Sequence, residues 1–221
     1  SSREPHHITK GNEMSSLSRR LSVLLVLGFS GPSLAQGWIE FTSQTDRFGV
    51  NFPGEPEVQE FDYLSAFDAV FPARTYSAQA GENRFSTTVV DFSDSFRIHS
   101  EMEKTEAATG PTNWLYDQRA SVARAAREFR QRGGEVTYDA WSHIDRAEGL
   151  QLQITNTDGS RTFAGIYLNG NTSRLYVLEA TVAAQSPLPG LFQQSLRLLN
   201  EEGTERIRYL LSANGCTVER D

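Results

Sequence analysis

The sequence is poor in the residues that most often carry chemistry in proteins. Its 221 residues include one cysteine and four histidines. Cys216 has no second cysteine with which to form an internal disulfide. Only His99 and His143 follow residue 35, and neither lies in the spacing of a zinc site. There is also no glycine-rich phosphate loop. We therefore predict no metal, no cofactor and no nucleophilic or metal-dependent catalysis.

The sequence also lacks a hydrophobic run long enough to cross a membrane. Its longest apolar run, residues 21–29, is about half the ~20 residues that a spanning helix needs. Arg19 and Arg20 precede this run, and small residues ending at Ala35 follow it. This order is typical of a secretory signal peptide. We predict an upstream extension at 1–13, a signal peptide at 14–35 and no membrane span after cleavage.

Positive charge is scarce as well. The formal net charge of −7 becomes −9 once the first 35 residues, with four basic and two acidic side chains, are removed. An acidic chain is a poor general binder of nucleic acid. Lys104 is the only lysine after residue 35, an arginine preference that suggests a GC-rich bacterial genome. We therefore expect a periplasmic or secreted protein that binds no nucleic acid.

What the chain does contain is strand-like alternation around one clear helical segment. Residues 113–132 have a helical period, with an expected apolar stripe of Leu115, Val122, Ala126 and Phe129. A long polar connection, 93–111, precedes this helix. Short strands are predicted at 38–41, 48–52, 58–61, 73–79, 84–92, 136–144, 150–154, 161–168, 174–182 and 195–199. A short helix is predicted at 187–194 and a tail helix at 204–213.

Tight turns between these strands predict an antiparallel sheet. The segment 174–182 is apolar on both faces, so we place it in the centre of the sheet. The fold class is α+β, an antiparallel β-sheet flanked by one long and one short helix in a sandwich. A single domain spans 36–200, and 201–221 forms a C-terminal tail.

Several segments between residues 38 and 199 form a distinctive set, mostly of fold-forming apolar and turn residues. They are Trp38, the stretch Phe-Gly-Val-Asn-Phe-Pro-Gly-Glu-Pro at 48–56, the helix before Gly133 and Gly134, Arg174-Leu175-Tyr176 and the segment 192–196. Together they resemble the PsbP-like group, which includes the extrinsic P-subunit of photosystem II and related bacterial periplasmic proteins. The resemblance implies an antiparallel sheet flanked by helices and, by analogy, an accessory domain that binds a partner.

Basic side chains gather on one edge of the predicted long helix. The net charge of residues 113–132 is +3, although the domain as a whole is acidic. Such arginines can face solvent, cover apolar surface or pair with nearby acids. They can instead dock an unknown envelope protein or an anionic envelope component, together with the 93–111 connection. The partner-binding candidates are Arg119, Arg124, Arg127 and Arg130.

Two functions of different classes fit these observations. The first is a non-enzymatic periplasmic accessory or assembly module that binds a protein partner. The second is a small-ligand-binding protein or hydrolase whose site is scattered over loops. Two local alternatives stay open: a calcium site among Asp91, Asp94, Glu101 and Glu103, and an exposed aromatic anchor at Trp114 and Tyr116.

The first prediction concerns processing of the chain. Ser33 and Ala35 place small residues where the processing enzyme recognises them, so we expect the exported protein to begin at Gln36. The intact mass of the exported protein measures this end directly. A mature species that retains residues 21–29 would show that the segment is an anchor.

Overall fold

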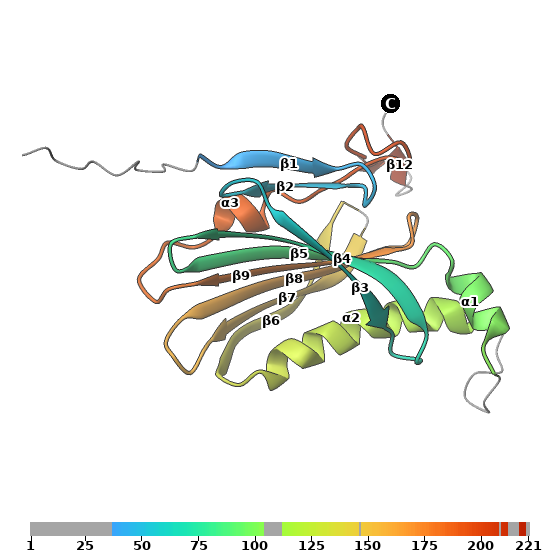
Figure 1. Cartoon of the computed structure of the whole chain (residues 1–221), viewed down its shortest axis with the longest axis horizontal. Helices are drawn as coiled ribbons and strands as arrows, with labels where there is room; N and C mark the ends of the chain where they lie inside the picture. Colours follow the sequence, from blue (N-terminus) through green and yellow to red (C-terminus); the bar gives the residue numbers. More distant parts are fainter. Residues whose placement is uncertain (1–36, 104–111, 146, 208, 212–216, 220–221) are drawn as a thin grey trace, which may run out of the picture. The chain divides into compact units, whose positions relative to one another are not determined.

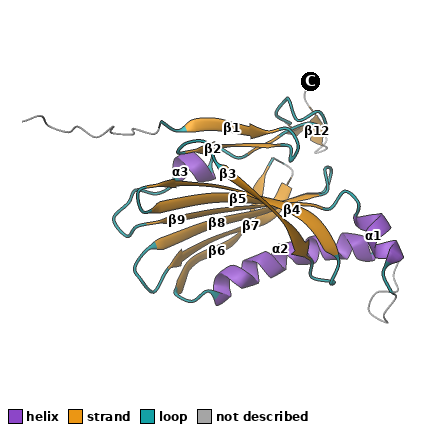
Figure 2. Cartoon of the chain, in the orientation of Figure 1, coloured by secondary structure: helices purple, strands orange, loops and turns teal. Residues whose placement is uncertain are grey.

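The computed structural model describes residues 37–103, 112–145, 147–207, 209–211 and 217–219. These ranges contain three helices among the strands (Figures 1 and 2). The sequence predicted two helices before the C-terminal tail. The three helices in the structure are α1 (Ser95–Glu101), α2 (Asn113–Gln131) and α3 (Gly190–Gln193). The strands are β1 (Ile39–Ser43), β2 (Phe48–Phe52), β3 (Glu57–Leu64), β4 (Val70–Ala80), β5 (Asn83–Asp91), β6 (Glu135–Ile144), β7 (Ala147–Thr155), β8 (Arg161–Asn169), β9 (Arg174–Val182), β10 (Arg197–Leu198), β11 (Tyr209–Leu211) and β12 (Thr217–Glu219).

Seven strands form one antiparallel sheet in the order β3-β4-β5-β9-β8-β7-β6. β9 lies in the middle, as its apolar residues on both faces predict. Leu175 and Tyr176 are both fully buried, and as neighbours in a strand they point to opposite faces. The sheet is therefore covered on both sides at its centre.

A small antiparallel sheet, β1-β2-β10, packs with α3 against one face of the large sheet. The alternation in β2 predicted that Phe48, Val50 and Phe52 share a face, and all three are fully buried in this layer. The ring of Phe48 contacts Tyr76 of β4 and the ring of Phe52 contacts Phe192 of α3, with ring centroids 5.1 and 5.4 Å apart. These aromatic contacts hold the small sheet to the large one.

Helix α2 packs against the opposite face, where its later turns follow the predicted stripe. Val122, Ala126 and Phe129 are buried in an apolar layer with the sheet, and Gly133 and Gly134, both at φ 89°, end the helix. The prediction for Leu115 was wrong, because its side chain is 38% exposed. The early turns of α2 meet α1 as well as the sheet, and their buried positions are the polar residues Asp117, Gln118 and Ser121.

Two other segments differ from their predictions. Residues 95–101, expected within a polar connection, form α1, in which Arg97 pairs with Asp94 and Glu101 at helical spacing. The expected tail helix over 204–213 is not formed, because β11 and β12 pair as antiparallel strands. The dipeptide Asn214-Gly215 is also typical of a hairpin turn between two strands. Residues 1–36 with the predicted signal peptide, 104–111 and 212–216, which include Cys216, lie outside the described residues.

A buried carboxylate joins the two sheets. Asp46, in the turn between β1 and β2, accepts hydrogen bonds from the Tyr76 hydroxyl at 2.6 Å and from Arg74 Nη1 at 2.9 Å. Its backbone carbonyl accepts a hydrogen bond from the Tyr176 hydroxyl at 3.0 Å. Burial, together with the hydrogen bond to Asp46, raises the pKa of Tyr76 to about 12. Both tyrosines come from the large sheet, so the side chain and the backbone carbonyl of Asp46 together tie the turn to it.

The second prediction tests this connection. Replacing Asp46 with alanine leaves the Tyr76 hydroxyl and Arg74 without their shared acceptor, because Asp46 is only 2% exposed. We expect the free energy of unfolding to fall by about 3 kcal/mol in urea titrations. Asp139→Ala, which breaks the half-exposed pair with Arg130, is the matched control and should cost less than about 1 kcal/mol. Equal losses in the two variants would contradict the assigned role of Asp46.

Candidate functional site

Two of the four candidate arginines on α2 have partners within the domain. Arg130 donates to both carboxylate oxygens of Asp139, at 2.7 and 2.9 Å. Arg124 donates to Glu128 at 3.0 Å and to the Ser65 carbonyl at 2.5 Å. The hydrogen bonds from the two carboxylates raise the pKa of both guanidinium groups. The charges of these two arginines are thus balanced locally, which was the first of the two interpretations of the basic edge.

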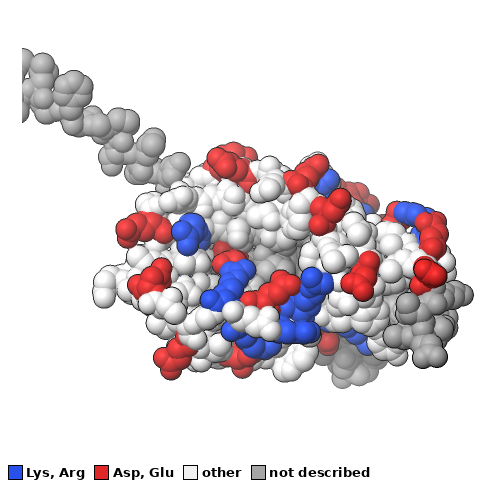
Figure 3. Space-filling view, turned by 60° about the horizontal axis from the view of Figure 1, so that its bottom comes forward, with Lys and Arg blue, Asp and Glu red and all other residues white. Residues whose placement is uncertain are grey.

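The other two candidates, Arg119 and Arg127, are exposed, and neither makes an ion pair with another residue that the structure describes. Figure 3 shows the face on which α2 lies, where basic side chains gather near the middle with acidic side chains among them. The basic edge is therefore not one continuous patch. Its free positive charge is concentrated at Arg119 and Arg127.

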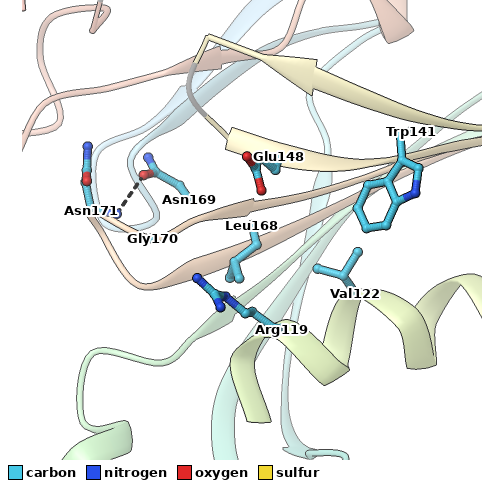
Figure 4. Close-up of a pocket in the computed structure, with 8 residues that line it drawn as sticks. All are labelled: Arg119, Val122, Trp141, Glu148, Leu168, Asn169, Gly170 and Asn171. Atoms are coloured by element: carbon cyan, nitrogen blue, oxygen red, sulfur yellow. Dashed lines mark hydrogen bonds between the residues drawn. The ribbon is translucent and has the colours of Figure 1, made fainter. Parts of the chain in front are cut away.

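Arg119 lines a cleft of about 390 Å³ between α2 and the end of the sheet near β6. The other lining residues are Val122 from α2, Trp141 from β6, Glu148 from β7, Leu168 from β8 and the turn Asn169–Asn171. In Figure 4, Trp141 and Val122 lie at one end of the cleft and the turn at the other. Arg119, Glu148 and Leu168 lie between these two ends (Figure 4).

Trp141 is the most exposed large apolar residue in the described part of the chain, at 77%. It pairs across the strands with Leu150, whose side chain packs in the layer beneath α2. The indole therefore lies on the helix-covered side of the sheet, on the outermost strand. Nothing in the alternating sequence of β6 distinguishes an exposed tryptophan from a buried one, so the sequence analysis missed it, together with Glu148 and Leu168.

The cleft combines three kinds of contact. Arg119 offers planar hydrogen-bond donors to a carboxylate or phosphate, and Trp141 offers an aromatic face to an apolar or cationic group. Glu148 adds a negative charge, and its cross-strand neighbour is His143. No ion pair joins Arg119 to Glu148 among the described contacts, so both groups are available to an incoming molecule. Such a site can bind and orient a partner group.

The other histidine, His99, lies in a buried polar cluster between α1 and α2. Its Nε2 lies 2.9 Å from Oδ2 of Asp117, and the two side chains are 9% and 0% exposed. The second carboxylate oxygen of Asp117 accepts the backbone N–H of Phe67 at 3.1 Å. The carboxylate thus joins α1, α2 and the loop before β4. The His99 ring is thus engaged in a contact within the fold.

Three of the four acidic calcium-site candidates near α1 are paired with arginines. Asp91 pairs with Arg174, and Asp94 and Glu101 both pair with Arg97. Within the described residues, no group of three histidine, cysteine, aspartate or glutamate side chains is placed to hold a metal ion. In the same residues, no helix is both long and apolar enough to cross a membrane.

The fold and cleft define an α+β protein with an antiparallel sheet between a helical layer and a smaller sheet. No protein-family model matches the sequence, and no curated protein matches it either. Among solved structures, the chain is similar to cyanobacterial PsbP (CyanoP) from Synechocystis sp. PCC 6803. The identity is 12% and the TM-score 0.41, and the match covers 78% of this chain and 98% of that one. This neighbour carries the name of the group that the sequence motifs resemble.

The third prediction concerns the joint made by Asp117. Asp117→Ala removes a fully buried acceptor and leaves His99 and the Phe67 N–H without their hydrogen-bond partner. We therefore expect a loss of about 3 kcal/mol in the free energy of unfolding. Asp117→Asn retains one acceptor oxygen and should lose about 1 kcal/mol. Urea titration measures both losses, and hydrogen exchange should show faster exchange of the α1 amides. Unchanged exchange in the alanine variant would contradict this role of Asp117.

Proposed function

We propose that this chain is a non-enzymatic accessory or assembly module of the periplasm, or a secreted one, that binds a protein partner. The cleft between α2 and the β6 end of the sheet is its docking surface. The observation that carries this proposal is the 77% exposed indole of Trp141 beside an arginine that has no ion-pair partner among the described residues. Exposed tryptophan and free arginine are the residue types that contribute most to protein interfaces.

The shape of the cleft favours a protein partner over a small molecule. Sites for small molecules usually enclose most of the ligand surface. Here the lining comes from one helix and three strand ends, and Trp141, Arg119 and Glu148 are all exposed to solvent. A partner loop or strand could insert an apolar side chain next to Trp141 and an acidic side chain next to Arg119, while the rest of its surface contacts the rim.

The surroundings of the two histidines support a non-enzymatic role. His99 is held by Asp117 inside a structural joint, and His143 is exposed on the outermost strand. The signal peptide predicted at 14–35 supports the location outside the cytoplasm. A domain of net charge −9 with a local positive site would select the acidic portion of its partner rather than a generally anionic surface.

The fourth prediction tests the docking surface by affinity capture from the native envelope, with mass spectrometry of the retained proteins. The bait is the full exported protein, compared with its Arg119→Gln/Trp141→Ala variant. We expect the variant to retain the specific partner about tenfold less, because each residue contributes on the scale of an interface hot spot. Arg119→Gln alone should also weaken the dependence of capture on salt, whereas Trp141→Ala alone should not.

Arg84→Gln is the matched control for this experiment. Arg84 is also exposed, but it pairs in register with Thr181, at the opposite end of β5 from Asp91 and the cleft. Capture by this control should equal that of the unmodified protein. If the double variant folds and retains the same proteins with the same salt dependence, the cleft is not the docking surface. Saturable binding of a small molecule, lost in the double variant, would favour a ligand-binding protein instead.

A further inference from the structure

Strand β3 is the edge strand at the other end of the large sheet, and no other described strand pairs with its outer side. In the described chain, β3 pairs only with β4, in an unbroken antiparallel register from Glu57 opposite Ser77 to Leu64 opposite Val70. Every residue of β3 except Tyr63 is exposed. Along these eight residues, the backbone N–H and C=O groups of alternate residues therefore point away from the sheet.

Proteins usually protect such an edge with lysine, proline or a bulge. β3 contains neither lysine nor proline, and its register has no shift. The opposite edge differs, because β6 has an irregularity between Val136 and Tyr138. Of the two edges of the large sheet, only β3 offers a regular template on which another strand can pair throughout.

One face of β3 has an ordered pattern of side chains. Val58, Glu60, Asp62 and Leu64 alternate along the strand and therefore share a face. Glu60 accepts a hydrogen bond from Arg74 at 2.7 Å, and Arg74 also binds Asp46, so this is the face toward the small sheet. Val58 and Leu64 are 53% and 48% exposed. The face presents an apolar residue, two carboxylates and a second apolar residue in order.

Charge argues against a second copy of this chain on the edge. In a two-fold antiparallel pair that keeps the helices of both copies on one side, opposite residues lie on the same face of the sheet. Two registers of this kind pair seven residues of β3 with the second copy, more than any other, and they are centred on Phe61 and on Glu60. The register centred on Phe61 places Glu60 opposite Asp62 twice. The register centred on Glu60 places that carboxylate opposite itself. Like charges directly opposite each other destabilise strand pairing, and Arg74 is already shared with Asp46.

We propose that β3 is a second docking site, at which an extended segment of a partner protein adds to the sheet as an antiparallel strand. The segment carries, at alternate positions, an apolar residue, two basic residues and an apolar residue, which pair with Leu64, Asp62, Glu60 and Val58. Backbone hydrogen bonds supply affinity in this mode of recognition, and the alternate side chains supply specificity. The site is independent of the cleft beside α2, and its occupant has the opposite charge.

The fifth prediction tests the site with synthetic peptides on the full exported protein. The first peptide has the sequence Leu-Thr-Lys-Thr-Lys-Thr-Leu, and the second replaces both lysines with glutamate. We expect the lysine peptide to bind in a fluorescence anisotropy titration and to slow hydrogen exchange of the β3 amides. The glutamate peptide should do neither. Glu60→Gln/Asp62→Asn should weaken binding of the lysine peptide about 3- to 10-fold at low salt.

Glu135→Gln/Asp158→Asn is the matched control, because it removes two exposed carboxylates, one from β6 at the opposite edge of the sheet and one from the turn between β7 and β8, and changes the net charge equally. It should leave the affinity for the lysine peptide unchanged, and so should the Arg119→Gln/Trp141→Ala cleft variant. Unfolding midpoints equal to that of the unmodified protein verify that the β3 variant remains folded. If the cleft variant still binds the lysine peptide, the β3 site is separate from the proposed docking cleft. This conclusion does not depend on the result of the capture experiment, which tests the cleft alone.

Three outcomes would overturn the proposal. The first is no binding of the lysine peptide, and the second is equal binding of both peptides. The third is protection of β3 amides that grows with protein concentration in the absence of peptide, together with a dimer in sedimentation. That result would assign the edge to a second copy of the chain.

Discussion

The large sheet is wider than the layers that cover it, and this limit shapes the rest of the structure. Helix α2, of 19 residues, covers one face, and a three-stranded sheet with α3 covers the other. Apolar burial is therefore greatest at β8 and β9 and decreases toward the outer strands, where β3 is almost entirely exposed and Trp141 of β6 faces solvent. Because burial of apolar area drives folding, the centre supplies stability and the margins remain free for contacts with other molecules.

The two margins have opposite electrostatic character. At the β6 end, α2 contributes Arg119 beside Trp141, and Glu148 is the one acidic residue among the described residues that line the cleft. At the β3 end, carboxylates stand between exposed apolar residues, and Arg74 only partly balances them. A single module with two such margins could hold two different chains at once. Under the two docking proposals, each partner is selected by its own charge.

Polar side chains make the joints between the layers. Asp46 ties the β1–β2 turn to tyrosines of the large sheet, and Asp117 ties α1 to α2. Each carboxylate is nearly or fully buried, and each has at least two hydrogen-bond partners. Buried polar groups of this kind are costly unless fully paired, so they favour one arrangement of the layers. Neither joint was predicted, because both bring together residues that are distant in sequence.

The sequence by itself determined the local secondary structure, which depends on residues that are neighbours along the chain. Alternation and apolar runs identified β2, β9 and the later turns of α2, and the antiparallel class followed from short turns. Tertiary structure alone decided which arginines are balanced, because Asp139 and Ser65 approach α2 only after folding. It also decided that Leu115 and Trp141 are exposed, since burial depends on how far the covering layers extend. Periodicity describes the faces of an element, and only packing decides what lies against each face.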